Sequence, residues 1–212
     1  MNQTENLIIA LGEYKDSVIL IKSGSPLDEL PINFAKSEPS GKFALLSSIN
    51  THMTIGGLTE EISLIHGQNV IHEHLNKKHY NPGDVIYIPA KNKENPLRHI
   101  ILLVLDPSLE LSNHQERNVF KENIIKALEE AERHGMEAVV LPGIGCGNSS
   151  MSLQHSADVH FEAIEEFVTR YESRGSLKLF SICLRQSVES EVFRDVWRIR
   201  SKKYRLCWMM NS

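Results

Sequence analysis

The sequence has little of what marks secreted, membrane-spanning or strongly cationic proteins. Three cysteines among 212 residues, Cys146, Cys183 and Cys207, are too sparse for a disulfide framework and fit an intracellular, reducing setting. The first apolar stretch, 7–11, is too short for a signal peptide, and no run reaches the roughly 18 apolar residues of a membrane span. A formal charge of -4 provides no overall basic field for nucleic acid or an anionic membrane.

The remaining composition is that of a folded domain, with 41% hydrophobic and 24% charged residues. We expect an N-terminal extension or edge strand at 1–16, one domain at 17–197 and a basic, aromatic tail at 198–212. The tail has five basic residues and no acid, so the body is more acidic than the total suggests. The tail could contact nucleic acid or a protein partner, or it could continue the last helix and pack through its apolar side chains.

Short apolar runs typical of buried strands alternate with longer amphipathic stretches typical of helices. Strands are predicted at 17–21, 43–47, 85–89, 99–105, 138–141 and 177–184. One or two helices are predicted from 59 to about 79, and single helices at 116–134, 153–171 and 187 to about 197. This alternation predicts a three-layer α/β/α sandwich around a central mixed sheet, with ligands at the carboxyl ends of the strands.

One loop in such a position is rich in glycine. The segment LPGIGCGNSS, 141–150, follows a predicted strand and precedes a predicted helix. Glycines allow close backbone approach, and N–H groups beside a helix N-terminus bind anions, so the loop suits a phosphate or diphosphate; a plain tight turn is the alternative. A Rossmann cofactor site is less favoured because Asn148 stands where that motif needs its third glycine. A Walker A loop is excluded because its Gly-Lys-Ser/Thr sequence is missing.

A second loop follows the strand at 43–47. Asn50 stands at the end of that strand, and Gly56 and Gly57 come just before a predicted helix. The Asn50 amide can both donate to and accept from a sugar hydroxyl, although asparagine is also a common turn residue.

Together the two loops resemble the macro domain family. Residues 47–50 (SSIN) stand at its Asn-Ala-Ala-Asn motif, and 55–58 (IGGL) stand at its Gly-Gly-Gly-Val loop. The segments 82–92, 98–107 and 142–148 are similar to three further motifs of the family in the expected order. The resemblance extends over about 17–197 and implies a macro domain-like fold.

The resemblance also implies a cleft that binds ADP-ribose or an ADP-ribosylated protein, in some members with hydrolysis of the ADP-ribosyl group. Asn50 would face the distal ribose, which Gly56, Gly57 and Leu58 would border. The residues implied to wrap the diphosphate, largely through their backbone, are Gly143, Ile144, Gly145, Cys146, Gly147 and Asn148. The resemblance implies no bound cofactor.

Several positions differ from the family pattern. Ser25, after Gly24, replaces the acid that reads the adenine amino group, and Arg185 replaces a phenylalanine that stacks on adenine. The Arg185 guanidinium could stack instead, or it could be an exposed rim residue.

Further departures affect catalysis. Ser47 replaces the first asparagine of the family motif, and Thr59 replaces an aspartate that activates water in one hydrolase branch. Glu60 or Glu61 could substitute as a base beside Asn50, the alternative being that both are solvated residues of a helix first turn.

Other reactive side chains have weaker patterns. His72, His74 and His79 lack the spacing of a shared metal-binding helix face, so we expect a solvated face and no metal. Cys146 could be an activated thiol at a helix N-terminus, but the simpler interpretation is a loop residue that contributes its N–H.

Three functions remain open from the sequence. The first is a reader of ADP-ribose, and the second is a hydrolase of ADP-ribosyl groups. The third is an interaction module that has lost nucleotide binding and acts through its tail. The replacements at positions 25, 47 and 59 favour the first and third over the second.

Overall fold

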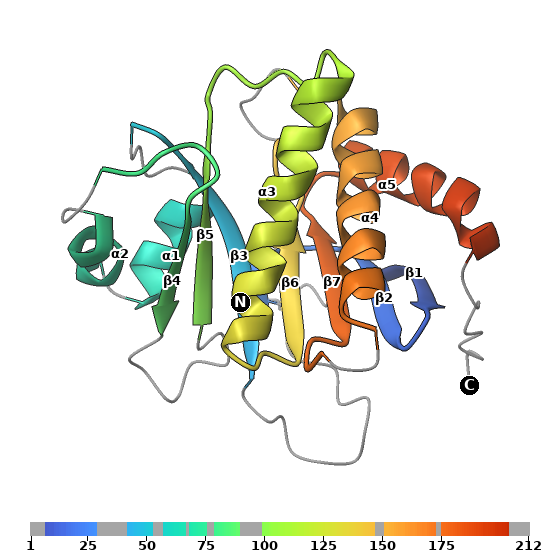
Figure 1. The fold of residues 1–212 in the computed structure, drawn as a ribbon, viewed down its shortest axis with the longest axis horizontal. Helices are drawn as coiled ribbons and strands as arrows, with labels where there is room; N and C mark the ends of the chain where they lie inside the picture. The colour runs from blue at the N-terminus through green and yellow to red at the C-terminus, as the bar shows by residue number, and fades with distance from the viewer. Residues whose placement is uncertain are drawn as a thin grey trace.

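The computed structural model describes residues 7–28, 42–52, 57–66, 68–75, 79–89, 99–146, 151–172 and 175–203. Their centre is a seven-stranded sheet in the order β1-β2-β7-β6-β3-β5-β4 (Figure 1). Its strands are β1 (Leu7–Tyr14), β2 (Ser17–Ser23), β3 (Phe43–Asn50), β4 (Val85–Pro89), β5 (His99–Leu105), β6 (Ala138–Pro142) and β7 (Leu179–Leu184). The five central strands are parallel, and β1 and β4 form antiparallel edges.

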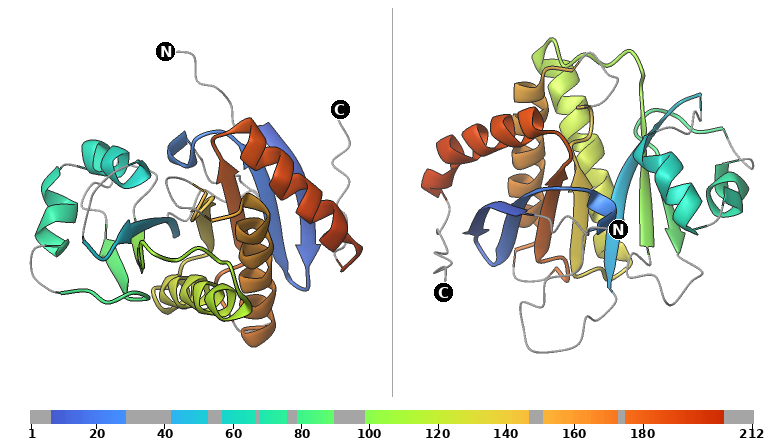
Figure 2. Two further views of the ribbon diagram at one scale, coloured as in Figure 1. Left: turned by 90° about the horizontal axis from the view of Figure 1, so that it is seen from above. Right: turned by 180° about the vertical axis from the view of Figure 1, so that it is seen from behind.

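Helices cover both faces of this sheet (Figure 2). They are α1 (Leu58–His66), α2 (Gln68–Leu75), α3 (His114–Arg133), α4 (Leu153–Arg170) and α5 (Ser187–Arg200). The helices α3, α4 and α5 share one apolar cluster with the sheet, while α1 and α2 share a second cluster on the opposite face. The predicted three-layer α/β/α architecture is therefore confirmed.

Strand β5 shows why the sheet must be covered on both sides. Its sequence HIILLVL has no polar alternation. Ile101, Leu103 and Leu105 join the α3/α4/α5 cluster, whereas Ile100, Leu102 and Val104 join the α1/α2 cluster. Successive side chains of a strand point to opposite faces, so a continuous apolar run fits only a strand buried on both faces.

The sheet opens at its carboxyl end between β3 and β6. Their ladder comprises three residue pairs and stops at Leu45 and Val140, although β3 remains paired with β5 as far as Asn50. The chain leaves β3 towards α1 on one face and leaves β6 towards α4 on the other. Adjacent strands with connections to opposite faces define the crevice where open α/β sheets bind ligands.

Regular elements lie at both ends of the described chain. The segment 7–14 is a full edge strand, and α5 continues three residues beyond the predicted end at Trp197. Arg200 fastens this extension because its guanidinium lies 2.8 to 3.5 Å from the carboxylates of Asp158, Glu162 and Glu165 on α4. Residues 204–212 of the predicted tail lie outside the described residues.

Candidate functional site

The parallel strands bring most of the predicted site residues to one edge of the sheet. Gly24 and Ser25 follow β2, Asn50 ends β3, Gly143 follows β6, and Arg185 follows β7. The backbone N–H of Gly24 donates to the Leu184 carbonyl oxygen at 2.9 Å, which places the β2 and β7 ends side by side. These residues thus lie along the same edge of the sheet as the crevice between β3 and β6.

Arg185 connects two parts of this edge. Its guanidinium donates two hydrogen bonds, of 2.6 and 2.5 Å, to the two carboxylate oxygens of Glu61 on α1, and it also lies 3.5 Å from the Ser25 hydroxyl oxygen. The two paired side chains are 36% and 44% exposed. Arg185 is therefore a partly exposed cation with a fixed carboxylate partner, and both Glu61 oxygens are engaged.

The start of α1 is tied to β3 by buried hydroxyl groups. Thr59 donates to the Ser48 carbonyl oxygen at 3.0 Å, and the Ser47 hydroxyl lies 2.9 Å from that of Thr59. Ser47 and Thr59 are 2% and 1% exposed. The residue at the position of the hydrolase aspartate is thus a buried structural anchor.

Other predicted residues lie near this helix start. Glu60 is exposed, Leu58 is half-buried at the first position of α1, and Gly57 has a positive φ of 55° with open space where a Cβ would be. The Asn50 side-chain oxygen accepts from the His52 backbone N–H at 3.0 Å, so Asn50 forms the turn that the sequence left as an alternative. Gly56 lies outside the described residues.

The glycine-rich loop has a tightly defined first half. Gly145 adopts a φ of +83°, and a Cβ there would overlap the Met151 sulfur. A Cβ on Gly143 would lie 3.1 Å from both the Cys146 sulfur and a Leu184 methyl group. The positive φ favours glycine at position 145, and a Cβ there would also require the Met151 side chain to move. Gly147 and Asn148 lie outside the described residues.

Two N–H groups of this loop are used inside the protein. The Ile144 N–H donates to the buried His160 ring at 3.2 Å and also lies 2.8 Å from the Pro142 carbonyl oxygen. The Cys146 N–H donates to the Gly143 carbonyl oxygen at 3.0 Å. In this structure the N–H groups of Ile144 and Cys146 therefore already have partners within the protein.

The Cys146 side chain is not an activated thiol. Burial raises its pKa to about 11, against a smaller opposing effect of its hydrogen bond to Ser156. A thiol with that pKa is protonated at neutral pH and is a poor nucleophile. Of the described cysteines, Cys146 and Cys183 are both thiols rather than halves of a disulfide.

The described residues contain no group of three or more His, Cys, Asp and Glu side chains placed to hold a metal ion. Of the three histidines considered above, the His72 side chain is not among those described, and His74 and His79 belong to no such group. None of the described helices is both long and apolar enough to cross a membrane.

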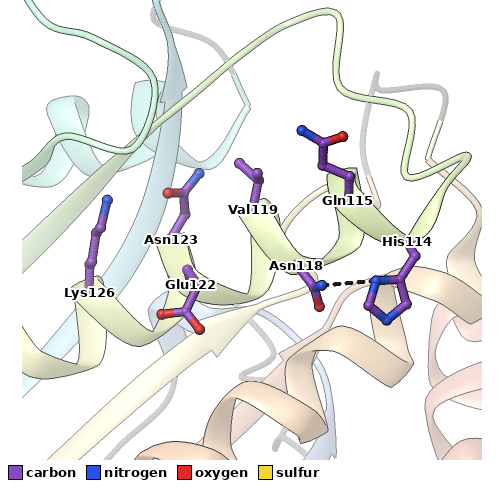
Figure 3. Close-up of a pocket in the computed structure, with 7 residues that line it drawn as sticks. All are labelled: His114, Gln115, Asn118, Val119, Glu122, Asn123 and Lys126. Atoms are coloured by element: carbon purple, nitrogen blue, oxygen red, sulfur yellow. Dashed lines mark hydrogen bonds between the residues drawn. The ribbon is translucent and has the colours of Figure 1, made fainter.

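A separate cavity of about 590 Å³ lies along the outer side of α3 (Figure 3). Its lining consists of His114, Gln115, Asn118, Val119, Glu122, Asn123 and Lys126. None of these residues belongs to the predicted site, so the cavity is a rival location against which the site can be tested.

The family assignment rests on sequence comparison. The family model described as "Macro domain" matches residues 47–160, which is more than half of the chain and includes the end of β3, all of α1 and the glycine-rich loop. The chain belongs to the macro domain family. The resemblance found in its two loops is thereby confirmed, whereas a search of curated proteins gave no match.

Solved macrodomain structures share the fold at low sequence identity. A mutant of the Oceanobacillus iheyensis macrodomain is 15% identical, with a TM-score of 0.74 over 95% of this chain and 97% of that one. The O. iheyensis macrodomain with ADP is 15% identical, with a TM-score of 0.72 over 94% and 100%. The Trypanosoma brucei macrodomain in complex with ADP-ribose is 13% identical, with a TM-score of 0.65 over 84% and 68%.

Sequence reasoning missed the contacts between these residues. Neither the Arg185–Glu61 pair, 124 positions apart, nor the Ser47–Thr59 contact has a local sequence signal. The contact of His160 with Ser156 did have a local sequence signal, because the two residues are four positions apart and therefore lie on the same face of α4.

Proposed function

We propose that this macro domain binds ADP-ribose, free or attached to protein, as a reader of ADP-ribosylation. The observation that carries the proposal is the meeting of Ser25, Arg185 and the glycine-rich loop at the carboxyl ends of adjacent strands in a chain of this family. ADP and ADP-ribose are the ligands in structures of two macrodomains with this fold.

In this proposal the ligand extends along the mouth of the crevice. The loop from Gly143 to Asn148 contacts the diphosphate. Its hydrogen-bond donors to the diphosphate are N–H groups other than those of Ile144 and Cys146. The Ser25 hydroxyl and the Arg185 guanidinium lie beside the base. At the opposite end, the distal ribose meets Asn50 and the segment from Gly56 to Leu58.

Glu61 has a positioning role here. Because both of its oxygens accept from Arg185, it fixes the plane of the guanidinium and offsets its charge. A planar guanidinium held in this way presents a flat face to a base, and the neutral Ser25 hydroxyl completes the contact.

Titration calorimetry with ADP-ribose tests the binding. We expect a one-to-one complex with the wild-type protein and an affinity at least about tenfold lower for Arg185→Glu, which places a second carboxylate beside Glu61 and next to an anionic ligand. A failure of the wild-type protein to bind ADP-ribose at millimolar concentration would reject the proposal.

Arg198→Glu is the matched control for that variant. It makes the same charge change on α5, the helix that begins two residues after Arg185, at a side chain that is 68% exposed and pairs with Asp195 rather than with a site residue. An equal loss of affinity in both variants would mean that Arg185 acts only through the overall charge of this part of the chain.

Hydrolysis of ADP-ribosyl groups is the second candidate, and the exposed carboxylate of Glu60 at the first turn of α1 is the observation that keeps it open. Release of ADP-ribose from a mono-ADP-ribosylated protein would show this activity. Turnover that is unchanged in Glu60→Gln and in Glu61→Gln would exclude both carboxylates as the base.

A module that acts through the tail is the third candidate. Its test is binding of a protein or RNA partner that is lost on removal of residues 204–212 while calorimetry with ADP-ribose gives no heat.

A further inference from the structure

His160 is a buried titratable residue that none of the roles above uses. It lies on the second turn of α4, is 0% exposed and sits directly beneath the glycine-rich loop. Two aromatic rings pack against it in T-shaped arrangements, with ring centroids 6.1 Å away at Phe120 and 5.5 Å away at Phe193. A polar ring in such surroundings must satisfy both of its nitrogens within the protein.

Both nitrogens are satisfied by backbone groups. The Nε2 atom accepts from the Ile144 N–H at 3.2 Å, and Nδ1 lies 2.7 Å from the Ser156 carbonyl oxygen. A carbonyl oxygen only accepts, so Nδ1 carries the proton and Nε2 does not. This assignment describes a neutral imidazole of one defined tautomer.

Ser156 binds the carbonyl group of the same loop residue, Ile144. Its hydroxyl donates to the Ile144 carbonyl oxygen at 2.8 Å, and the Cys146 thiol donates to the Ser156 hydroxyl oxygen at 3.3 Å. Ser156 is 0% exposed, and the Ile144 side chain, 2% exposed, is part of the core. Ile144 is thus fixed through its N–H, its carbonyl group and its side chain.

Burial of His160 outweighs the backbone carbonyl groups of Ser156 and Pro142, which favour its protonated form. Burial lowers its pKa from 6.5 to about 4, and the neighbouring Cys146 thiol is protonated because burial raises its pKa to about 11. The Glu189 carboxylate on α5 also raises the pKa of Cys146, and it accepts from the Gln186 backbone N–H in a capping box.

We propose that His160 and Ser156 are positioning residues that hold the first half of the glycine-rich loop in the conformation that binds the ligand diphosphate. The inference rests on the proposed function, because it takes this loop to be part of the binding site. When the His160 ring and the Ser156 hydroxyl are lost, the Ile144 N–H retains only its local contact with the Pro142 carbonyl oxygen, and the loop adopts further conformations. The apparent affinity for the ligand then falls in proportion to the population of the loop conformation that binds it.

The direct test compares His160→Leu with His160→Gln. Leucine removes the acceptor for the Ile144 N–H, whereas the side-chain oxygen of glutamine can replace Nε2 without titrating. We expect ADP-ribose affinity to fall about tenfold in His160→Leu and to stay within about threefold of wild type in His160→Gln. Ser156→Ala, which leaves the buried ring in place, should give an intermediate loss.

Two measurements separate positioning from general destabilisation. Val168→Ala removes buried methyl groups from the last turn of α4, far from the loop, and should lower stability with no change in affinity. The Ile144 amide should show slow hydrogen exchange in wild type and His160→Gln and faster exchange in His160→Leu, all measured well below the unfolding temperature.

The outcomes distinguish this inference from the proposed function. If the wild-type protein fails to bind ADP-ribose, both are overturned. If it binds and both His160→Leu and Ser156→Ala bind equally well, only the positioning role is overturned. An equal loss in His160→Leu and His160→Gln, with unchanged Ile144 exchange, would also contradict it.

Discussion

The two sides of the candidate cleft are held by different kinds of interaction. On the glycine-rich side, Ile144 is fixed by His160 and Ser156, and all three residues are at most 2% exposed. On the side of the proposed base, Arg185 and Glu61 form a well-aligned ion pair whose side chains are more than a third exposed. The first side combines neutral groups in a dry interior, and the second combines charges at the surface.

This difference predicts how each side responds to change. Removing one partner from a buried hydrogen-bonded set leaves an unsatisfied polar group, at about 1 to 3 kcal/mol. An exposed ion pair contributes only about 0 to 1 kcal/mol, because water screens it. We therefore expect a preformed diphosphate side and an adjustable base side, so that sequence changes beside the base alter specificity without unfolding the domain.

The largest effect is expected from Gly145→Ala. The positive φ of 83° strains any L-residue, and the added methyl group overlaps the Met151 sulfur, so we expect a loss of about 2 to 5 kcal/mol in the free energy of unfolding. Urea denaturation measures it. Gly57→Ala is the control, since its φ of 55° is similar but its surroundings are open, and it should lose only about 1 to 2 kcal/mol.

The next effect concerns pH. The folded state keeps His160 neutral, with a pKa of about 4, while the unfolded chain binds a proton near pH 6.5. The unfolded state therefore holds more protons between these values, and the free energy of unfolding falls as the pH is lowered from 6.5 towards 4. The contribution is on the order of 3 kcal/mol over this window.

His160→Gln isolates that contribution from the carboxylates that titrate in the same range. The free energy of unfolding, measured by denaturation at several pH values between 7 and 4, should fall more steeply with decreasing pH for wild type than for the variant. The same pH dependence in both proteins would show that His160 is not held neutral, and the account of the glycine-rich side would lose its main support.

The smallest effect is expected on the exposed side. A double-mutant cycle with Glu61→Gln and Arg185→Gln should give a coupling free energy below about 1 kcal/mol, which decreases with added salt. A coupling above about 2 kcal/mol that does not depend on salt would mean that this side is as rigid as the glycine-rich side.

The sequence predicted the layers and the location of the site because both depend on local pattern. Apolar runs such as 99–105 identify buried strands, and loops after parallel strands must meet at one edge. The pairing of Arg185 with Glu61 and the inward direction of the Ile144 N–H depend on side-chain and backbone geometry that no spacing encodes. The internal hydrogen bonds of the Ile144 and Cys146 N–H groups are visible only in the structure for that reason.

The central claim is that ligand binds at the carboxyl ends of the strands, between the fixed and the adjustable side. A titration with ADP-ribose, followed by amide chemical shifts, tests it most directly. We predict the largest shifts at Ser25, Gly57, Arg185 and the loop from Gly143 to Cys146, with none along the outer side of α3. Shifts confined to the α3 cavity around Asn118 and Val119, or no shifts at all, would contradict the account.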